Sequence, residues 1–232
     1  TGDYIFPCDQ DDIWHLDKVQ KMTECMEKHP EIELLAANYV TFFSENDTGS
    51  GSKLYAARSK KMKSDESLEL LGIDPKWPYV NRPGCVFCFT KLFYNSISSK
   101  WDTKYPHDAI LWRFARMDRA LGLLNYPVID FRRHGNNATS EANWTIKSRI
   151  QTFNDYICFH EMALERVKSC EDKKIVETGI RVLEKRKLFL TNGNILVWLE
   201  LATKYQMFYN SIKGSLRDLL LFTTRKRSVK NG

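Results

Sequence analysis

The feature that most constrains the fold is a change in hydrophobic pattern near residue 140 of this 232-residue chain. Before that point, short runs of strand-forming residues alternate with segments whose apolar residues recur every three or four positions. That alternation is typical of an α/β layer around a sheet. After it, only long amphipathic helical patterns follow. We therefore expect an α/β domain over residues 1–141 and a helical appendage over residues 142–232.

The expected elements follow from apolar spacing and from turn residues. Strands are predicted at 4–8, 32–43, 82–90 and 123–135, and helices at 15–29, 91–97 and 107–117. Residues 64–72 are ambiguous and fit a short helix, with Ser64 as its N-cap and Gly72 as its stop.

Composition narrows the class of protein. A formal net charge of +6 is mild and does not indicate nucleic acid, although it suits an anionic substrate or an anionic membrane face. No apolar run approaches the roughly 20 residues of a spanning helix. The six cysteines lie mostly in apolar segments, which predicts a reducing, cytoplasmic setting. Cys85 and Cys88 have no second pair to complete a zinc site, so a structural role is expected for them.

Three carboxylates, Asp9, Asp11 and Asp12, directly follow the first apolar strand pattern. Like charges held this close need a counter-charge, such as a divalent cation that takes oxygen ligands or a basic neighbour. The alternative is that Asp11 or Asp12 caps the next helix and Asp9 lies in a solvated turn. The triplet alone does not decide between these readings.

The stretch DQDDIWHLDKV resembles the metal-binding DxD segment of inverting nucleotide-sugar glycosyltransferases of family two, which include rhamnosyltransferase-like, polysaccharide-building enzymes. Later stretches resemble further motifs of that family in the same order: RPGCVFCF (82–89), PHDAIL (106–111) and FRRHGNNAT (131–139). The resemblance covers residues 1 to about 140 and implies a partial GT-A fold, a Rossmann-like mixed sheet.

The resemblance also implies roles for single residues. Asp11 would bind Mn²⁺ or Mg²⁺, His134 would reach the metal or the diphosphate, and Asp108 would be the general base. The residues implied in donor binding are Asp9, Gly84 and Arg133, and those on the acceptor side are Trp14, Trp77 and His107. Asp12 would structure the turn. The alternatives are that Asp108 is only a helix cap and that Arg132, Arg133 and His134 form a solvated basic strand end.

The implied reaction transfers a sugar from a UDP- or dTDP-sugar to a hydroxyl of a saccharide or lipid-linked acceptor, with inversion. Family members carry a nucleotide-binding half before the DxD segment, which this sequence lacks. The chain is therefore expected to be either part of a longer enzyme or a non-catalytic binding or scaffold module. A metal-dependent phosphatase or nuclease is a third class, but its nucleophilic or Lys-bearing acidic motifs are not evident.

The C-terminal stretch LRDLLLFTTRKRSVK joins leucines to a basic flank. One reading is a helix packed on the rest of the chain, and the other is peripheral contact with an anionic membrane. The second reading would place a cytoplasmic protein on the inner face of the membrane.

Overall fold

The computed structural model describes residues 2–43, 57–133 and 145–230, and the side chains of the last range as far as residue 224. Two compact units are present. The sheet unit comprises residues 1–72 and 80–142, and the helical unit comprises residues 73–79 and 143–232. The expected boundary between 141 and 142 falls in a stretch outside the described residues. The presence of segment 73–79 in the helical unit is a feature that the sequence analysis does not anticipate.

The sheet unit is built on a mixed sheet, which agrees with the expected α/β class. Its strands are β1 (Tyr4–Ile5), β2 (Ile13–Trp14), β3 (Leu34–Phe43), β4 (Leu68–Leu71), β5 (Phe87–Thr90) and β6 (Leu121–Arg133). The order is β1-β5-β3-β6-β2, and β4 pairs with the first half of β6. β3 and β6 run parallel, and the other pairs are antiparallel.

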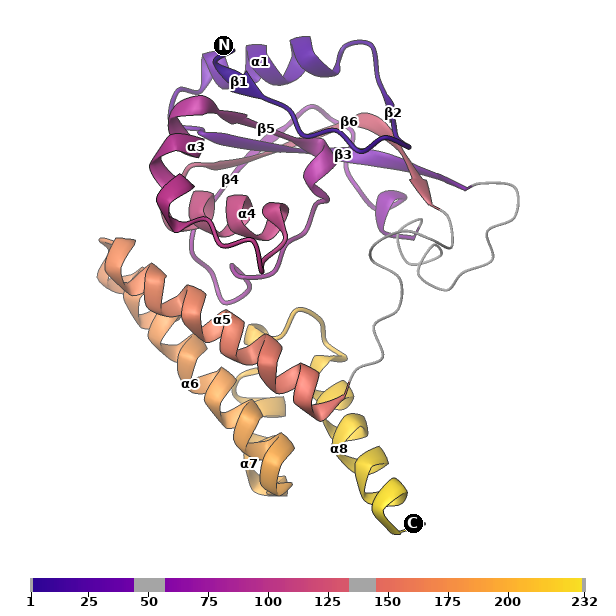
Figure 1. Cartoon of the computed structure of the whole chain (residues 1–232), viewed down its shortest axis with the longest axis vertical. Helices are drawn as coiled ribbons and strands as arrows, with labels where there is room; N and C mark the ends of the chain where they lie inside the picture. Colours follow the sequence, from indigo (N-terminus) through magenta and orange to yellow (C-terminus); the bar gives the residue numbers. More distant parts are fainter. Residues whose placement is uncertain (1, 44–56, 134–144, 231–232) are drawn as a thin grey trace. The chain divides into compact units, whose positions relative to one another are not determined.

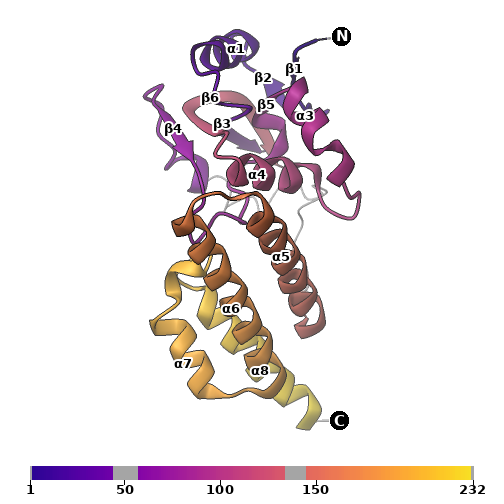
Figure 2. The same ribbon diagram turned by 90° about the vertical axis from the view of Figure 1, so that its left-hand side faces the viewer.

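The two central strands are buried and bent. Leu34, Leu35 and Leu121 are fully shielded from solvent, as expected for strands covered on both faces. The β3–β6 register shifts on either side of Asn38, which lies opposite Pro127. A proline inside a central strand is tolerated at such an irregularity, since it cannot donate to the ladder. Helices α1 (Lys18–Lys28) and α4 (His107–Met117) lie on opposite sides of the sheet (Figures 1 and 2).

Three predicted elements differ from the structure. The strand expected at 4–8 is shorter and spans only Tyr4–Ile5. The short helix expected at 64–72 is wrong: Leu68–Leu71 forms β4, because its backbone pairs with Leu121–Leu124 of β6. The strand expected over 82–90 begins only at Phe87, after a 3₁₀ turn at Gly84–Val86 (η1). Helix α3 (Lys91–Ile97) then follows, with Thr90 accepting a hydrogen bond from the Phe93 amide as its N-cap.

The helical unit contains α5 (Ile146–Arg166), α6 (Cys170–Asn192), α7 (Ile195–Thr203) and α8 (Gly214–Lys230). Helices α5 and α6 pack side by side (Figures 1 and 2). Local signals fix their ends: α5 starts with a capping box at Thr145 and Ser148, and α6 stops at Gly193 in the left-handed region. The core of the helical unit is apolar and aromatic. It is formed by Phe153, Val182, Leu183, Phe189, Leu190, Leu201, Tyr209 and Phe222.

Segment 73–79 completes this helical core. Trp77 is fully buried with its ring 4.9 Å from that of His160. The Tyr79 hydroxyl donates to the Phe208 carbonyl at 3.0 Å and lies 3.4 Å from Arg186 Nη1. Arg186 is itself buried and forms two hydrogen bonds to Asp218. None of the helices in the described part of the chain combines the length and low charge needed to cross a bilayer.

Candidate functional site

A cavity of about 560 Å³ opens in the sheet unit. It is lined by Asp9 and Asp11, Arg58, residues 80–84, residues 106–108, Phe131 and Arg133. Acids and arginines therefore share one hollow, although they come from separate parts of the sequence. Such a mixture suits a ligand that carries anionic groups together with a cation.

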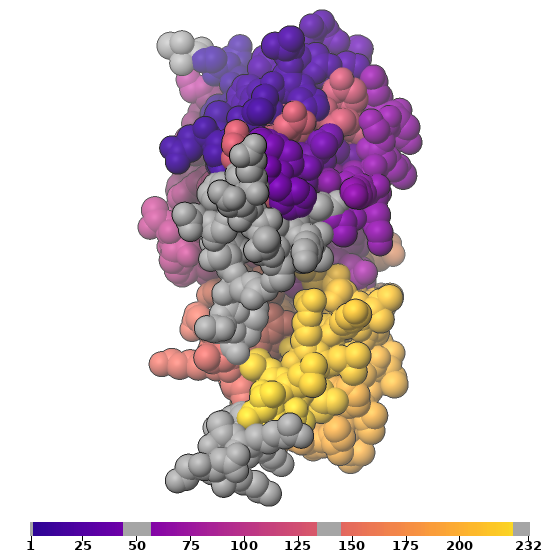
Figure 3. All heavy atoms as spheres, turned by 90° about the vertical axis from the view of Figure 1, so that its right-hand side faces the viewer, coloured from indigo at the N-terminus to yellow at the C-terminus, as the bar shows by residue number. Residues whose placement is uncertain are grey.

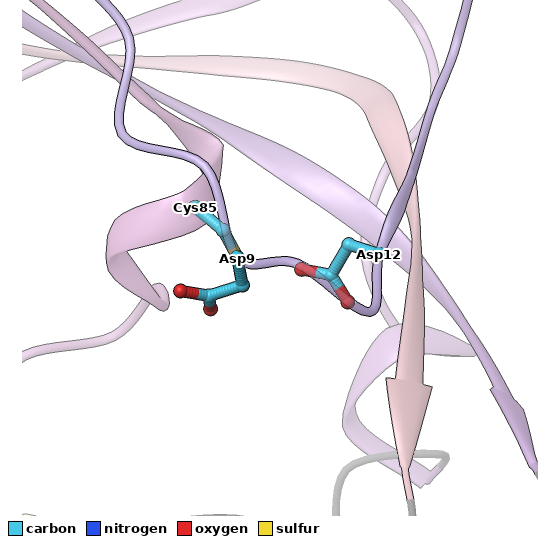
Figure 4. Close-up of side chains that lie close together, drawn as sticks. All are labelled: Asp9, Asp12 and Cys85. Atoms are coloured by element: carbon cyan, nitrogen blue, oxygen red, sulfur yellow. The ribbon is translucent and has the colours of Figure 1, made fainter.

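Two of the three clustered carboxylates meet a buried thiol, and one of the two, Asp9, lines this cavity. Ligand atoms of Asp9, Asp12 and Cys85 all lie within 4.8 Å of one another. Both acids come from the loop between β1 and β2, and Cys85 comes from η1 (Figure 4). Among the described residues this is the group of His, Cys, Asp and Glu side chains whose spacing suits a metal ion.

Of the three residues in this group, Asp12 most favours a bound cation. Its Oδ1 accepts a hydrogen bond from the Arg132 amide at 2.9 Å. Its Oδ2 is buried and has no hydrogen-bond partner among the described residues. Burial raises the pKa of Asp12, the Arg132 amide and the nearby Cys85 thiol oppose that shift, and the charges of Asp11 and Asp9 add to it. A bound cation would satisfy the buried oxygen and stabilise the ionised form, so the group fits a metal.

Cys85 contributes a neutral group rather than a thiolate. It is 1% exposed, and burial raises the pKa of its thiol, with the charges of Asp12 and Asp9 raising it further. A protonated thiol is a poor metal ligand. The two carboxylates are therefore the stronger donors, and oxygen donors suit Mg²⁺ or Mn²⁺ better than soft metals.

Gly84, His107 and Asp108 also line the cavity and lie close together. A Cβ atom at position 84 would lie 2.5 Å from His107 Nε2 and 3.3 Å from the Asp108 Cβ, so a larger residue would push both aside. Asp108 lies in the first turn of α4, where the helix dipole favours a negative charge. The Asp108 side chain is half-buried and lines the cavity, as a proton acceptor for a bound ligand would.

Arg82 and Arg133 bring positive charge to the cavity. Arg82 donates to Asn38 Oδ1 from Nε at 3.0 Å and from Nη2 at 2.8 Å, which fixes its guanidinium. Burial lowers the pKa of Arg82. Arg133 is 3% exposed, with its guanidinium 5.6 Å from the Phe131 ring centre. The half-buried Arg82 and the buried Arg133 are suited to phosphate oxygens, because a guanidinium can bind them in pairs.

The structure brings together six of the residues singled out from sequence. The residues that line the cavity are Asp9, Asp11, Gly84, His107, Asp108 and Arg133. The expected metal assignment differs from the geometry, because Asp12 joins Asp9 in the metal-type group while Asp11 lies outside it. Asp12 also holds the turn, as expected, through its bond to Arg132. His134 lies outside the described residues.

The two tryptophans expected on the acceptor side do not line the cavity. Trp77 belongs to the helical unit and has no exposed surface, so it cannot touch an acceptor there. Trp14 is half-buried and carries the Lys18 ammonium 3.5 Å from its ring centre. Lys18 is fully buried and donates to the Cys85 carbonyl at 2.8 Å, so Trp14 and Lys18 together support the turn that holds Cys85.

Sequence reasoning missed Cys85 as a neighbour of the acids and missed Arg82 as a cavity residue. Arg82 opens the RPG stretch, two residues before Gly84, and its charge in an otherwise apolar segment was an available signal. Cys85 had no such signal, because a cysteine in an apolar run reads as a small core residue.

Comparison with known proteins adds no further identification: no protein-family model, no curated protein and no solved structure matches the chain. The cavity and its residues are therefore the basis for inferring a function.

Proposed function

We propose that the sheet unit carries the metal-binding and acceptor-activating part of an inverting glycosyltransferase. The donor would be a UDP- or dTDP-sugar, and the acceptor a hydroxyl of a saccharide or of a lipid-linked saccharide, in the cytoplasm. The observation that carries the proposal is the shared cavity of about 560 Å³, which is lined by Asp9, Asp11, Asp108 and three arginines. Each of these groups corresponds to a need of the reaction.

The proposed division of labour follows the charges. Asp9 and Asp12 would hold Mn²⁺ or Mg²⁺, and the bound ion would supply positive charge against the leaving diphosphate. Arg82 and Arg133 bind diphosphate oxygens and fix the donor across the cavity. Asp11 lines the same cavity and would contact the donor's hydroxyl groups.

Asp108 acts as the general base. As the acceptor oxygen forms a bond to the anomeric carbon, its proton passes to the Asp108 carboxylate. The bond from that carbon to the diphosphate oxygen breaks on the opposite face, and its electron pair leaves with the nucleoside diphosphate. Attack from the face opposite the leaving group inverts the configuration.

The test uses the full 232-residue chain and two donors, UDP-glucose and dTDP-rhamnose. Calorimetry should detect binding of at least one donor in the micromolar-to-millimolar range, and only when Mn²⁺ or Mg²⁺ is present. When mixed saccharide acceptors are added, free nucleoside diphosphate should be released as the sugar is transferred to an acceptor hydroxyl. The absence of metal-dependent binding to any nucleotide-sugar would refute the proposal.

The same measurement separates the alternative, a non-catalytic binding or scaffold module. That alternative predicts donor binding with no release of nucleoside diphosphate, even with mixed saccharide acceptors present. The presence of a base candidate at the cavity favours the enzyme, since a binding module has no need of one.

A further inference from the structure

Two adjoining hollows lie on the helical unit, between the start of α5 and residues 217–224 of α8. One has a volume of about 780 Å³ and the other about 290 Å³. They share Leu221 and Thr224, so we treat them as one feature, the α5–α8 groove. Helix α8 (yellow) faces the viewer in Figure 3. The groove belongs entirely to the helical unit and includes none of the cavity residues described above.

The floor of the groove is apolar. Ile146, Ile150 and Leu221 line it and are only partly buried against the helical core. Leu220 also lines it and is 62% exposed, and Leu216, one turn earlier on the same face of α8, is 50% exposed. Leucines this exposed, beside isoleucines that are not fully covered, leave a continuous apolar strip in contact with water.

Cations border this strip. Lys147 and Arg217 line the groove, and within the described part of the chain neither forms an ion pair with a carboxylate. The acid in the lining, Asp218, is 1% exposed and is paired with Arg186 and Arg149, so its charge is already balanced. The accessible charge of the groove is therefore positive.

The surrounding sequence strengthens this charge pattern. Residues 190–232 contain seven Lys and Arg residues and two acids. Four of those cations, Arg225, Lys226, Arg227 and Lys230, belong to the last turns of α8. Basic clusters of this size on a helix with exposed leucines are the sequence pattern of attraction to anionic lipids.

We propose that the α5–α8 groove binds an anionic membrane lipid. Its hydrocarbon chain lies along Ile146, Ile150 and Leu220, and its phosphate group lies beside Lys147 and Arg217. Charge complementarity and the apolar floor both argue for one amphiphile, since a free phosphate ion would use only the cations. Lipid binding would hold the chain at a membrane surface without crossing it.

The test is sedimentation of the full chain with vesicles of phosphatidylcholine, with and without phosphatidylglycerol. We expect partitioning onto the mixed vesicles to exceed that onto neutral ones by at least about tenfold, and to weaken as salt is added. Equal binding to both vesicle types would overturn the proposal. The proposal would also be overturned if inorganic phosphate alone protected residues 145–151 from hydrogen exchange as strongly as the mixed vesicles do.

Matched variants test whether the groove is responsible. Lys147→Glu with Arg217→Glu should lower partitioning by at least about tenfold. Lys173→Glu with Lys174→Glu, an identical change of charge at exposed positions of α6, should have a clearly smaller effect. Leu220→Gln should weaken binding, whereas Leu92→Gln should not, although Leu92 is 78% exposed on α3.

The remaining outcomes are also decisive. Control variants that weaken binding as much as the groove variants would show that overall charge, not the groove, attracts the membrane. Groove variants that bind like the unmodified chain would exclude the site. An acidic peptide that competes as well as dihexanoyl-phosphatidylglycerol would replace the lipid with a protein partner. None of these results depends on nucleotide-sugar binding, so this proposal and the proposed function fail separately.

Discussion

Asp12 uses its two oxygens for two tasks. One anchors the turn through the Arg132 amide, and the other is buried beside Asp9 and Cys85 without a hydrogen-bond partner of its own among the described residues. An amide in place of the carboxylate would retain the first task and lose the second. The residue therefore allows the turn and the metal to be tested apart.

We expect Asp12→Asn to lower Mn²⁺ affinity by about tenfold or more, with thermal stability close to that of the unmodified chain. Asp11→Asn should lower Mn²⁺ affinity less, because Asp11 lies outside the metal-type group. Titration of Mn²⁺ followed by calorimetry measures both. A larger loss in Asp11→Asn would instead restore the ligand assignment expected from the sequence.

Asp108 is expected to act on the acceptor and not on the donor. Asp108→Asn should reduce the rate of nucleoside diphosphate release by about 10²- to 10⁴-fold while leaving donor affinity nearly unchanged. Calorimetry and a release assay on the same preparation separate the two effects. Release that persists at the original rate would exclude Asp108 as the base.

Lys18 gives the sheet unit a pH dependence. Burial lowers the pKa of Lys18 from 10.5 to about 8. Between these two pH values the folded chain has largely lost the Lys18 proton, whereas the unfolded chain still holds it. The stability contributed by Lys18 is therefore lowest below pH 8 and rises by up to about 3 kcal/mol as the pH approaches 10.5. That sign follows from the unfolded state binding more protons in this window.

The measurement is urea unfolding at about pH 7 and about pH 10, with the slope of the unmodified chain compared with that of Lys18→Met. The variant should lack the gain in stability. Lys28→Met, at an exposed position near the end of the same helix, is the control and should retain it. An identical pH slope in all three proteins would contradict the burial of a charged Lys18.

Among the elements, those with a strong internal period could be predicted and those set by pairing could not. The strand predicted at 32–43 and the helix predicted at 107–117 have clear apolar patterns. The structure has them at Leu34–Phe43 and His107–Met117, respectively. Leu68–Leu71 is too short to show a period, and its state is decided by the neighbouring β6. The same limit applies to η1, whose tight turn brings Gly84 against His107.

Trp77 tests which unit its segment serves. Trp77→Ala should destabilise the chain by about 3 to 5 kcal/mol, as expected for a fully buried aromatic side chain. The loss of hydrogen-exchange protection should appear in α5 and α6 and not in β3 and β6, because Trp77 packs against His160 of α5. Trp101→Ala, at a half-buried position of the sheet unit, is the contrasting control. Loss of protection centred on the sheet would contradict the division into units.

At the scale of the whole molecule, the sequence predicted which stretches meet but not which atoms do. One cavity is lined by four of these stretches: the loop between β1 and β2, the RPG stretch, the start of α4 and the end of β6. The choice of Asp12 over Asp11 for the metal-type group depends on the Arg132 amide, which is 120 residues away in the chain. A contact between residues so far apart in the chain cannot be recognised from the local sequence. The roles of Asp108 and Arg133 remain predictions.

The path of the chain through residues 72–84 has a practical consequence. The polypeptide leaves the sheet unit after Gly72, buries Trp77 and Tyr79 among helices, and returns as residues 80–84 of the cavity wall. Cutting the gene near residue 142 would therefore not release a self-sufficient sheet unit. It would remove the helices among which Trp77 and Tyr79 are buried and expose two large aromatic side chains to water.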